Sequence, residues 1–296
     1  MDQEWTILSI IKWGDEYLHR HEIEFSRLTI ELMLAKIYNC KRIDLYLQYD
    51  QPLTPDELKN LKQMVKERIK GRPLQYILGE VDFFDTNLLV CEGVLIPRPE
   101  TELLVEAIVA DIDTYKTENC PVILDLGTGS GNISIAVAKK CDSCKIFACD
   151  ISSKALDIAK ENAVRNNVAD KINFFKADIL HDWNRKTKTE FDYIVSNPPY
   201  VSLKDKRELS REVLDFEPHE ALFSGERGTE FYERIIDYFS SWLKPDGAMF
   251  FEIGINQKQP VLQFLQEKGF YDISMIDDLK RIPRVVRARK KQRKKG

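Results

Sequence analysis

The sequence contains no long apolar segment. No run of about 18 apolar residues occurs in it, and the charged N-terminus lacks the apolar core of a secretory signal. We therefore expect a cytoplasmic protein with no membrane partner. Hydrophobic residues make up 43% of the 296 positions, which excludes a disordered chain, and the length favours one large domain plus a smaller one.

Cysteine and histidine are also scarce. Six cysteines without a signal peptide indicate reduced thiols rather than a disulfide framework. Cys141 and Cys144 have the spacing of a zinc or redox motif, but no second such pair and no nearby histidine pair accompanies them. We predict no metal site. The four histidines are scattered and indicate neither a catalytic triad nor a ligand cluster.

The basic residues gather at one end of the chain. The formal net charge is −4, yet ten Lys or Arg and no acidic residue follow Leu279. The rest of the chain is therefore strongly acidic, which is unfavourable for a general nucleic-acid surface. We expect residues 287–296 to form a basic tail, either a solvated extension or an arm close to RNA, and we expect that the function does not require nucleic acid.

The first quarter of the sequence has the apolar periodicity of helices. Apolar residues recur at helical spacing over 7–18 and again over 28–37. Thr54-Pro55-Asp56-Glu57 then offers an N-cap, a proline at the first helical position and acidic residues in the first turn. We predict a helical substrate-recognition domain over 1–78 and a β-hairpin linker over 79–96.

From Pro97 onward, strand-like and helix-like segments alternate. The expected strands are 122–126, 145–148, 172–175, 193–195 and 248–253. The expected helices are 100–110, 132–139, 153–165, 229–242 and 259–267. This alternation predicts an α/β domain over 97–286, with a doubly wound, mostly parallel sheet covered by helices on both faces. Ligands bind at the carboxyl ends of the strands in such a fold.

A glycine-rich turn follows the first of these strands. Val122–Leu126 runs directly into Gly127-Thr128-Gly129-Ser130-Gly131, and the next segment is helical. Glycines at alternate positions let the backbone approach a ligand closely, because no Cβ stands in the way. The motif predicts a nucleotide-like cofactor at this turn, although such glycine patterns occur in several nucleotide-binding folds.

Two carboxylates follow the next two strands. Asp150 ends the second strand about twenty residues after the glycines, where a carboxylate binds both ribose hydroxyls in related folds. Asp178 follows the third strand, and we expect it to lie beside an adenine, with Ile179 offering an apolar contact. This spacing alone would also suit a dinucleotide dehydrogenase.

The fourth strand leads into Asn197-Pro198-Pro199-Tyr200. Two consecutive prolines fix the backbone and remove two N–H donors, so the loop is rigid and rich in acceptors. The side-chain oxygen of Asn197 and the carbonyl of Pro198 can receive the two hydrogens of a planar amino group, while the Tyr200 ring packs against the group that carries it. Methylation of a conjugated nitrogen needs such orientation more than it needs a strong base.

Together, the glycine turn, Asp150 and the Asn-Pro-Pro-Tyr motif resemble those of class I S-adenosylmethionine-dependent methyltransferases that act on planar amino groups. Three upstream segments narrow the resemblance to the peptide chain release factor glutamine methyltransferases: 71–80, Phe83-Phe84 and 94–102. Downstream, 216–218 and 221–225 also fit. The resemblance spans nearly the whole chain.

This resemblance implies a Rossmann-like, seven-stranded methyltransferase sheet, with S-adenosylmethionine as methyl donor and the glutamine of the Gly-Gly-Gln motif of class 1 release factors as substrate. The cofactor residues that the resemblance implies are Gly127, Thr128, Gly129, Ser130, Gly131 and Asp150. We expect Asp178, Ile179 and Asn197 to complete the cofactor site, although Ile179 stands where relatives carry an aromatic residue over the adenine. Asn197, Pro198, Pro199 and Tyr200 are the implied substrate site, with Asn197, Pro198 and Tyr200 catalytic. The sequence departs from the family at Pro283, where a glycine usually precedes Arg284 and Val285.

Other interpretations stay open on the motif alone. A methyltransferase that acts on adenine N6 or a guanine amino group of nucleic acid would use the same acceptors, because those groups resemble a glutamine amide. A non-catalytic binding module with this fold is a second alternative.

Arg98 and Glu100 either border the cofactor pocket, guide the substrate, or form an inter-domain salt bridge. We expect a monomer.

Overall fold

The computed structural model describes residues 5–115, 120–181, 183 and 189–291. It divides into two units, one comprising Met1–Glu80 with Arg211–Phe216, the other comprising Val81–Ser210 with Glu217–Gly296. Each unit is described by itself below. None of the helices within the described ranges is long and apolar enough to cross a membrane.

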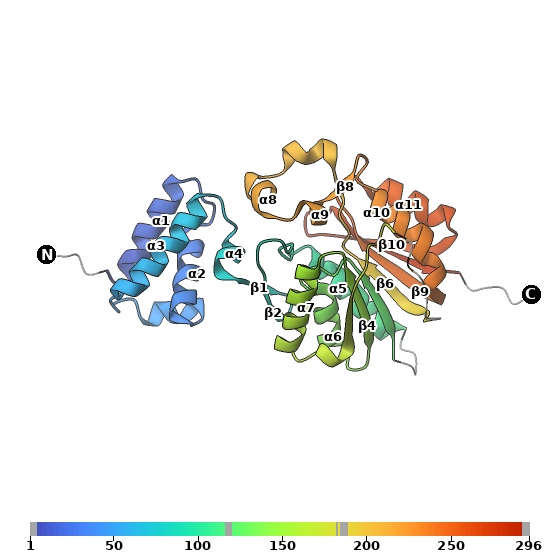
Figure 1. The fold of residues 1–296 in the computed structure, drawn as a ribbon, viewed down its shortest axis with the longest axis horizontal. Helices are drawn as coiled ribbons and strands as arrows, with labels where there is room; N and C mark the ends of the chain where they lie inside the picture. Colours follow the sequence, from blue (N-terminus) through green and yellow to red (C-terminus); the bar gives the residue numbers. More distant parts are fainter. Residues whose placement is uncertain (1–4, 116–119, 182, 184–188, 292–296) are drawn as a thin grey trace, which may run out of the picture. The chain divides into compact units, whose positions relative to one another are not determined.

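The first unit is helical (Figure 1). Its elements are α1 (Ile7–Arg20), α2 (Ser26–Tyr38), the 3-10 helix η1 (Arg42–Leu47), α3 (Pro55–Ile69), α4 (Leu74–Leu78) and the short α8 (Arg211–Phe216). Thr54 caps α3, since its hydroxyl accepts from the Glu57 N–H at 3.3 Å and the Glu57 carboxylate accepts from the Thr54 N–H at 2.7 Å. Helices α1 and α2 pack closely at Gly14, where a Cβ would lie only 2.5 Å from the Ile30 side chain.

The second unit contains a seven-stranded sheet in the order β10-β11-β9-β6-β3-β4-β5. Its strands are β3 (Val122–Leu126), β4 (Lys145–Asp150), β5 (Ile172–Lys176), β6 (Phe191–Ser196), β9 (Leu243–Glu252), β10 (Phe270–Asp277) and β11 (Pro283–Lys290). Strands β9, β6, β3, β4 and β5 are parallel to one another, whereas β11 pairs antiparallel with both β9 and β10. The predicted fold class, a mostly parallel sheet, is therefore confirmed.

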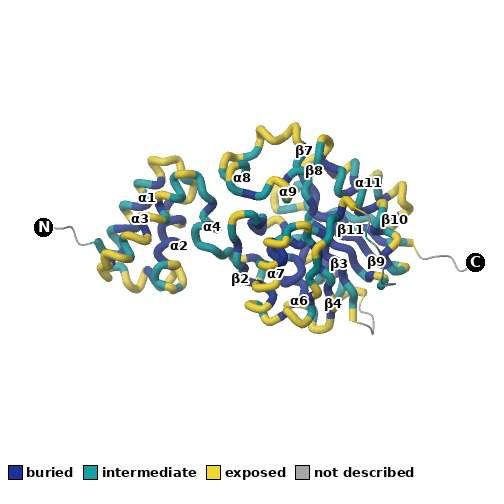
Figure 2. The backbone as a smooth tube through the Cα atoms, in the orientation of Figure 1, coloured by how far each residue is buried: buried dark blue, intermediate teal, exposed yellow. Residues whose placement is uncertain are grey.

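Helices cover both faces of this sheet (Figure 1). On one face pack α5 (Thr101–Thr114) and α6 (Asn132–Lys140), and on the other pack α10 (Glu230–Arg234), the π-helix η4 (Ile235–Phe239) and α11 (Lys258–Glu267). Side chains alternate along the strands, so Ile123 and the adjacent Leu124 belong to the two different cores. The central strands are buried accordingly (Figure 2), whereas the edge strands β5 and β10 are mostly not.

The remaining elements are short or connect the strands. They are β1 (Glu80–Phe83), which pairs with β2 (Thr86–Leu89), α7 (Ser153–Arg165), the 3-10 helices η2 (Ala169–Lys171), η3 (Leu203–Glu208) and η5 (Ser240–Trp242), α9 (His219–Leu222), and β7 (Val201–Ser202), which pairs with β8 (Phe223–Gly225). The segment 229–242, expected as one helix, is divided among α10, η4 and η5.

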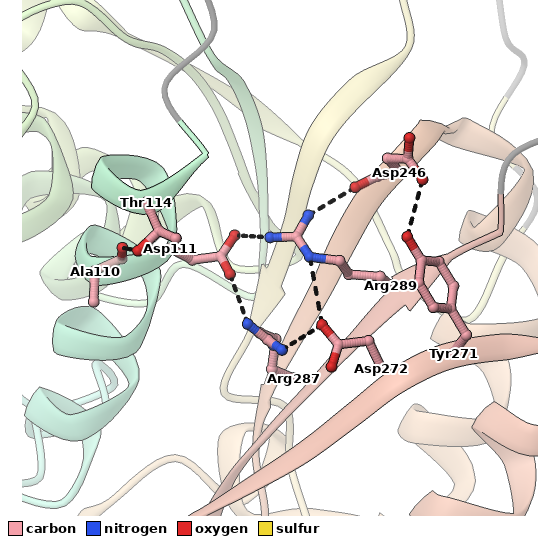
Figure 3. Close-up of polar contacts among 8 residues, drawn as sticks. All are labelled: Ala110, Asp111, Thr114, Asp246, Tyr271, Asp272, Arg287 and Arg289. Carbon is pink, nitrogen blue, oxygen red and sulfur yellow. Dashed lines mark hydrogen bonds and ion pairs between the residues drawn. The ribbon is translucent and has the colours of Figure 1, made fainter.

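The final strand corrects the predicted basic tail. Residues 287–290 belong to β11 rather than to a solvated extension, and residues 292–296 lie outside the described part of the chain. The reason is charge pairing: the carboxylate of buried Asp111 accepts from Arg287 at 3.0 Å and from Arg289 at 2.5 Å (Figure 3). The Arg289 guanidinium also donates to the Asp246 carbonyl at 2.8 Å, and that of Arg287 donates to Asp272 at 2.6 Å. Paired in this way, two arginines occupy a sheet strand.

The departure noted at Pro283 stands at the first residue of β11, directly after the turn that precedes this strand. The Asp278 carboxylate accepts from the backbone N–H groups of Lys280 and Ile282 at 2.8 and 3.0 Å, and it pairs with the Arg284 guanidinium at 3.0 Å. These contacts lower the pKa of Asp278, the backbone bond from Ile282 most of all. The β10–β11 hairpin therefore forms without a glycine at that position.

Candidate active site

A cavity of about 380 Å³ opens at the carboxyl ends of β3, β4, β5 and β6, wholly within the second unit. The sequence-predicted residues that line it are Gly127, Gly129, Asp150, Asp178, Ile179, Asn197 and Pro199. The other lining residues are Gly93, Val94, Leu95, Ile151, Ser152, Ala155, Ala177, Leu180, Pro218, Glu220, Ala221, Phe223, Ser224, Gly225 and Phe231. The cofactor turn and the Asn-Pro-Pro-Tyr loop thus meet in one cavity.

The glycines of the turn have different surroundings. Gly127 and Gly129 line the cavity at φ +75° and +55°, and a Cβ on Gly129 would meet no atom within 4 Å. Gly131 does not line the cavity, and a Cβ there would lie 2.9 Å from Ile135 and 3.2 Å from Ala159. Gly129 therefore leaves room for a ligand, whereas Gly131 lets helix α7 approach the start of α6.

The two hydroxyl residues of the turn are turned inward. Thr128 and Ser130 are buried and do not line the cavity. The Thr128 hydroxyl donates to Asp125 at 2.7 Å, and the carbonyl of Ser130 accepts from the Asn162 side chain at 3.0 Å. The Thr128 side chain and the Ser130 backbone thus stabilise the turn, and neither residue faces the cavity.

Asp125 on β3 is a buried carboxylate that the sequence analysis did not single out. One of its oxygens accepts from the hydroxyls of Thr128 and Ser134 at 2.7 and 2.6 Å, while the other has no hydrogen-bond partner. Burial raises the pKa of Asp125 to about 6. A charged residue inside the apolar strand 122–126 was the available signal.

Asp150 is in place at the end of β4. Its carboxylate accepts from the Gly129 N–H at 2.8 Å and from the Ser152 N–H at 2.9 Å. Burial raises the pKa of Asp150, and the backbone bonds from Ser152 and Gly129 oppose that shift. The bond to Gly129 couples the acidic residue to the glycine turn, so both face the same cavity.

Asp178 and Ile179 line the cavity beside the turn. The Asp178 carboxylate accepts from the Leu180 N–H at 2.8 Å and lies 2.7 Å from Nδ1 of His181. Ile179 is buried, and its Cδ1 lies 3.7 Å from the place a Cβ of Gly127 would take. The structure thus places an apolar side chain directly next to the glycine backbone.

The Asn-Pro-Pro-Tyr loop presents two of its four residues to the cavity. Asn197 and Pro199 line it, whereas Pro198 is buried and Tyr200 packs into the core. Burial raises the pKa of Tyr200 to about 12, so its phenol stays neutral. The ring lies against Gly254, where a Cβ would come within 2.8 Å of it.

Side chains from distant elements hold this loop. Nδ2 of Asn197 donates to the Thr101 hydroxyl oxygen at 3.2 Å, and the Thr101 hydroxyl donates to Glu252 at 2.5 Å. The side-chain nitrogen of Gln257 donates to the carbonyls of Tyr200 and Gly228 at 2.6 and 2.8 Å. Sequence reasoning missed Thr101, Glu252 and Gln257, because nothing in the pattern links them to the loop.

One wall of the cavity comes from the segment that begins at Glu217. Residues 218–225 contribute six of its lining residues. Buried Glu217 accepts from the Arg98 guanidinium at 2.6 Å and from the Ile96 N–H at 3.3 Å. Arg98 and Glu217 belong to the same unit, so this ion pair is not the inter-domain bridge considered above, and neither Arg98 nor Glu100 lines the cavity.

No group of three His, Cys, Asp or Glu side chains suited to a metal ion occurs in the part of the chain that the structure describes, and the six cysteines are free. The cavity suits an adenosine-bearing methyl donor instead: it offers an open glycine backbone, a carboxylate at Asp150 and an apolar side chain at Ile179.

Comparison with known proteins agrees with this fold. A family model described as the PrmC N-terminal domain matches residues 9–79, and one described as the methyltransferase small domain matches residues 99–225. Among solved structures, the N-terminal domain of human METTL16 in complex with SAH has a TM-score of 0.53 at 17% identity, covering 75% of this chain and 82% of that one. A methyltransferase from Pyrococcus furiosus gives 0.50 at 18% identity, covering 70% and 90%. These two structures support the fold alone.

Sequence relatives cover nearly the whole chain. The release factor glutamine methyltransferase of Geobacter sulfurreducens is 34% identical over 285 residues, covering 96% of this chain and 97% of the relative. That of Koribacter versatilis is 38% identical over 275 residues, covering 93% and 95%. Similarity of this extent includes both the helical unit and the cavity described above. The chain therefore belongs to the release factor glutamine methyltransferase family, and it is an S-adenosylmethionine-dependent methyltransferase.

Proposed function

We propose that this chain methylates the side-chain amide nitrogen of the glutamine in the Gly-Gly-Gln motif of class 1 peptide chain release factors. The observation that carries the proposal is the meeting of Asn197 and Pro199 with Gly129 and Asp150 in one cavity. The names of the full-length relatives support the choice of a release factor glutamine over a nucleobase.

Gly127, Gly129, Asp150, Asp178 and Ile179 would hold S-adenosylmethionine. Asp150 would accept from the ribose hydroxyls, while Asp178 and Ile179 would border the adenine. Thr128, Ser130 and Gly131 would act through the shape of the turn rather than through side-chain contact, and Asn197 borders both ligands. S-adenosylmethionine supplies a methyl group already activated by its positively charged sulfur.

The Asn-Pro-Pro-Tyr loop would bind the substrate amide. Oδ1 of Asn197 and the carbonyl of Pro198 accept its two N–H hydrogens, which fixes the amide plane and the direction of the nitrogen lone pair. Positive charge grows on that nitrogen as it bonds to carbon, and the same two acceptors stabilise this charge. Pro199 and Tyr200 keep the loop rigid, and the surplus proton leaves to water.

We also propose that the helical residues 1–78 recognise the protein substrate and that residues 79–96 link them to the catalytic domain. The catalytic domain would continue beyond residue 286 to the end of β11. The acidic charge of the chain outside its last residues favours association with a basic substrate domain. Such association would weaken as salt concentration rises.

The experiment is a transfer assay with radiolabelled S-adenosylmethionine and a purified class 1 release factor. Label should appear on the factor and disappear when its Gly-Gly-Gln glutamine is replaced by glutamate, because the carboxylate lacks the N–H groups that the loop accepts. Parallel reactions with DNA and ribosomal RNA test the nucleobase alternative. Label in nucleic acid and none in the factor would overturn the proposal.

A further inference from the structure

Three side chains from separate elements form a hydrogen-bonded chain behind the cavity. Asn197 follows β6, Thr101 is the first residue of α5, and Glu252 is the last residue of β9. Nδ2 of Asn197 lies 3.2 Å from the Thr101 oxygen, which lies 2.5 Å from Oε2 of Glu252. Thr101 is 0% exposed and Glu252 is 1% exposed, so water does not compete for these bonds.

The chemistry of these groups decides which atom donates and which accepts in each of these hydrogen bonds. An ionised carboxylate only accepts hydrogen bonds, and a hydroxyl has a single hydrogen to give. Thr101 therefore gives its hydrogen to Glu252 and offers only lone pairs to Asn197. The partner of those lone pairs must be the amino end of the Asn197 carboxamide, so the carbonyl end, Oδ1, is left for the cavity that Asn197 lines.

The opposite orientation would defeat the site. The two ends of a carboxamide have nearly the same shape, so only hydrogen-bond partners decide which end faces the cavity. A flipped Asn197 would present N–H donors to the N–H donors of a substrate amide, and neither group would find a partner. A buried donor without a partner makes binding of the substrate unfavourable.

We infer that Thr101 and Glu252 are positioning residues that lock the Asn197 carboxamide with its oxygen toward the cavity, and that this lock makes the site selective for a primary amide. The inference rests on the proposed function, since it concerns how the substrate amide is received. It assigns roles to two residues that do not line the cavity.

The surroundings of Glu252 make the lock sensitive to pH. Glu100, Arg98 and Arg284 act on its carboxyl group, and the phenols of Tyr200 and Tyr232 lie in its field. Burial, the dominant effect, raises the pKa of Glu252 to about 7. A protonated Glu252 can donate to the Thr101 oxygen, and the Thr101 hydroxyl can then donate to Oδ1 of Asn197. The direction of the hydrogen bonds is thereby reversed, and the amino end of Asn197 turns toward the cavity.

The backbone of the Asn-Pro-Pro-Tyr loop is anchored independently of the hydrogen bonds among Asn197, Thr101 and Glu252. Gln257 holds the Tyr200 carbonyl at 2.6 Å, and its own side-chain oxygen accepts from the Gly254 N–H at 3.0 Å. Replacing Thr101 therefore changes the orientation of the carboxamide while the loop stays in place. This separation allows a substitution to test orientation alone.

The first test compares Thr101→Val, Thr101→Ser and the control Thr114→Val in the full-length protein, with S-adenosylmethionine and a class 1 release factor. Thr114 lies on the same helix, is exposed, and its hydroxyl donates to the Ala110 carbonyl within that helix. Thr101→Val should lower kcat about 10-fold with little change in KM, because the amide bonds strengthen as charge grows on nitrogen. Thr101→Ser should stay near wild type, as should Thr114→Val, and the Kd for S-adenosylmethionine should change less than about twofold.

The second test is the pH dependence of kcat. Wild-type kcat should fall as pH is lowered from about 8 to about 6, and this fall should be absent in Glu252→Gln, whose amide does not titrate. An unchanged kcat in Thr101→Val, or an equal fall in wild type and Glu252→Gln, would overturn the inference. A wild-type protein that labels no release factor would instead count against the proposed function.

Discussion

The guanidinium of Arg98 lies 2.6 Å from a carboxylate oxygen of Glu217, and this ion pair joins the loop before α5 to the segment that forms one wall of the cavity. Glu217 is buried, so its charge depends on Arg98 for compensation. The same carboxylate accepts from the Ile96 backbone at 3.3 Å, a neutral donor that does not compensate the charge when Arg98 is removed.

We therefore expect Arg98→Ala to loosen residues 218–225 and to weaken S-adenosylmethionine binding by about 10-fold, with a smaller effect on kcat. Isothermal titration calorimetry with the cofactor measures this directly. Arg207→Ala is the matched control, because Arg207 is exposed on η3 and does not line the cavity. Equal cofactor affinity in the two variants would show that the ion pair does not support the wall.

The glycine turn gives a paired prediction. Gly131→Ala places a methyl group 2.9 Å from Ile135 at a φ of +83°, so overpacking adds to backbone strain and should lower the free energy of unfolding by about 2–5 kcal/mol. Gly129→Ala meets no protein atom, so it should cost only the backbone strain of about 1–2 kcal/mol while weakening cofactor binding at least about 10-fold. Urea unfolding and cofactor titration of both variants check this. Cofactor binding that is lost more severely in Gly131→Ala would contradict the assignment.

The Asp111 network should matter for stability and not for chemistry (Figure 3). Asp111→Asn removes the negative charge between the Arg287 and Arg289 guanidinium groups, and Arg289 is only 5% exposed. We expect a loss of about 3 kcal/mol in the free energy of unfolding, because a buried charge is left uncompensated. Asp272→Asn, at a carboxylate that is 43% exposed, should cost less than about 1 kcal/mol. Similar losses in both variants would contradict this account.

The raised pKa of Glu252 also predicts how the free energy of unfolding varies with pH. Its pKa is raised by burial to about 7 in the folded protein, above the value of the unfolded chain. At pH values between these two pKa values, the folded state binds more protons than the unfolded state. The free energy of unfolding therefore rises as pH falls from about 7 to about 5, and this contribution of Glu252 is lost above about pH 7. The difference in unfolding free energy between wild type and Glu252→Gln should change by on the order of 2–3 kcal/mol over that range. A difference that does not vary with pH would contradict the shift.

Much of the fold was predictable because its signals are local. The central parallel strands β3, β4 and β6 are short, largely buried apolar runs, and each ends next to a glycine or a polar residue, as at Gly127, Asp150 and Asn197. The rule that ligands bind at the carboxyl ends of parallel strands then brings Gly129, Asp150 and Asn197 together. The structure places all three on one cavity.

The remaining features depend on partners far away in the sequence. Arg287 and Arg289 resemble a solvated tail until Asp111, 176 and 178 positions earlier, is known to pair with them. Thr101 and Asn197 are separated by 96 positions, so no periodicity could connect them. The glycines of the turn look equivalent in sequence, and the packing of Ile135 and Ala159 against Gly131 distinguishes it from Gly129.

The most direct test of the proposed function is tandem mass spectrometry of a class 1 release factor after reaction with wild type, with Asn197→Ala and with the exposed control Asn173→Ala on β5. The wild type and the control should place one methyl group on the side-chain nitrogen of the Gly-Gly-Gln glutamine. Asn197→Ala should lower kcat at least about 10²-fold while binding S-adenosylmethionine almost as tightly. An unmodified glutamine after reaction with the wild type, or full methylation by Asn197→Ala, would contradict the account.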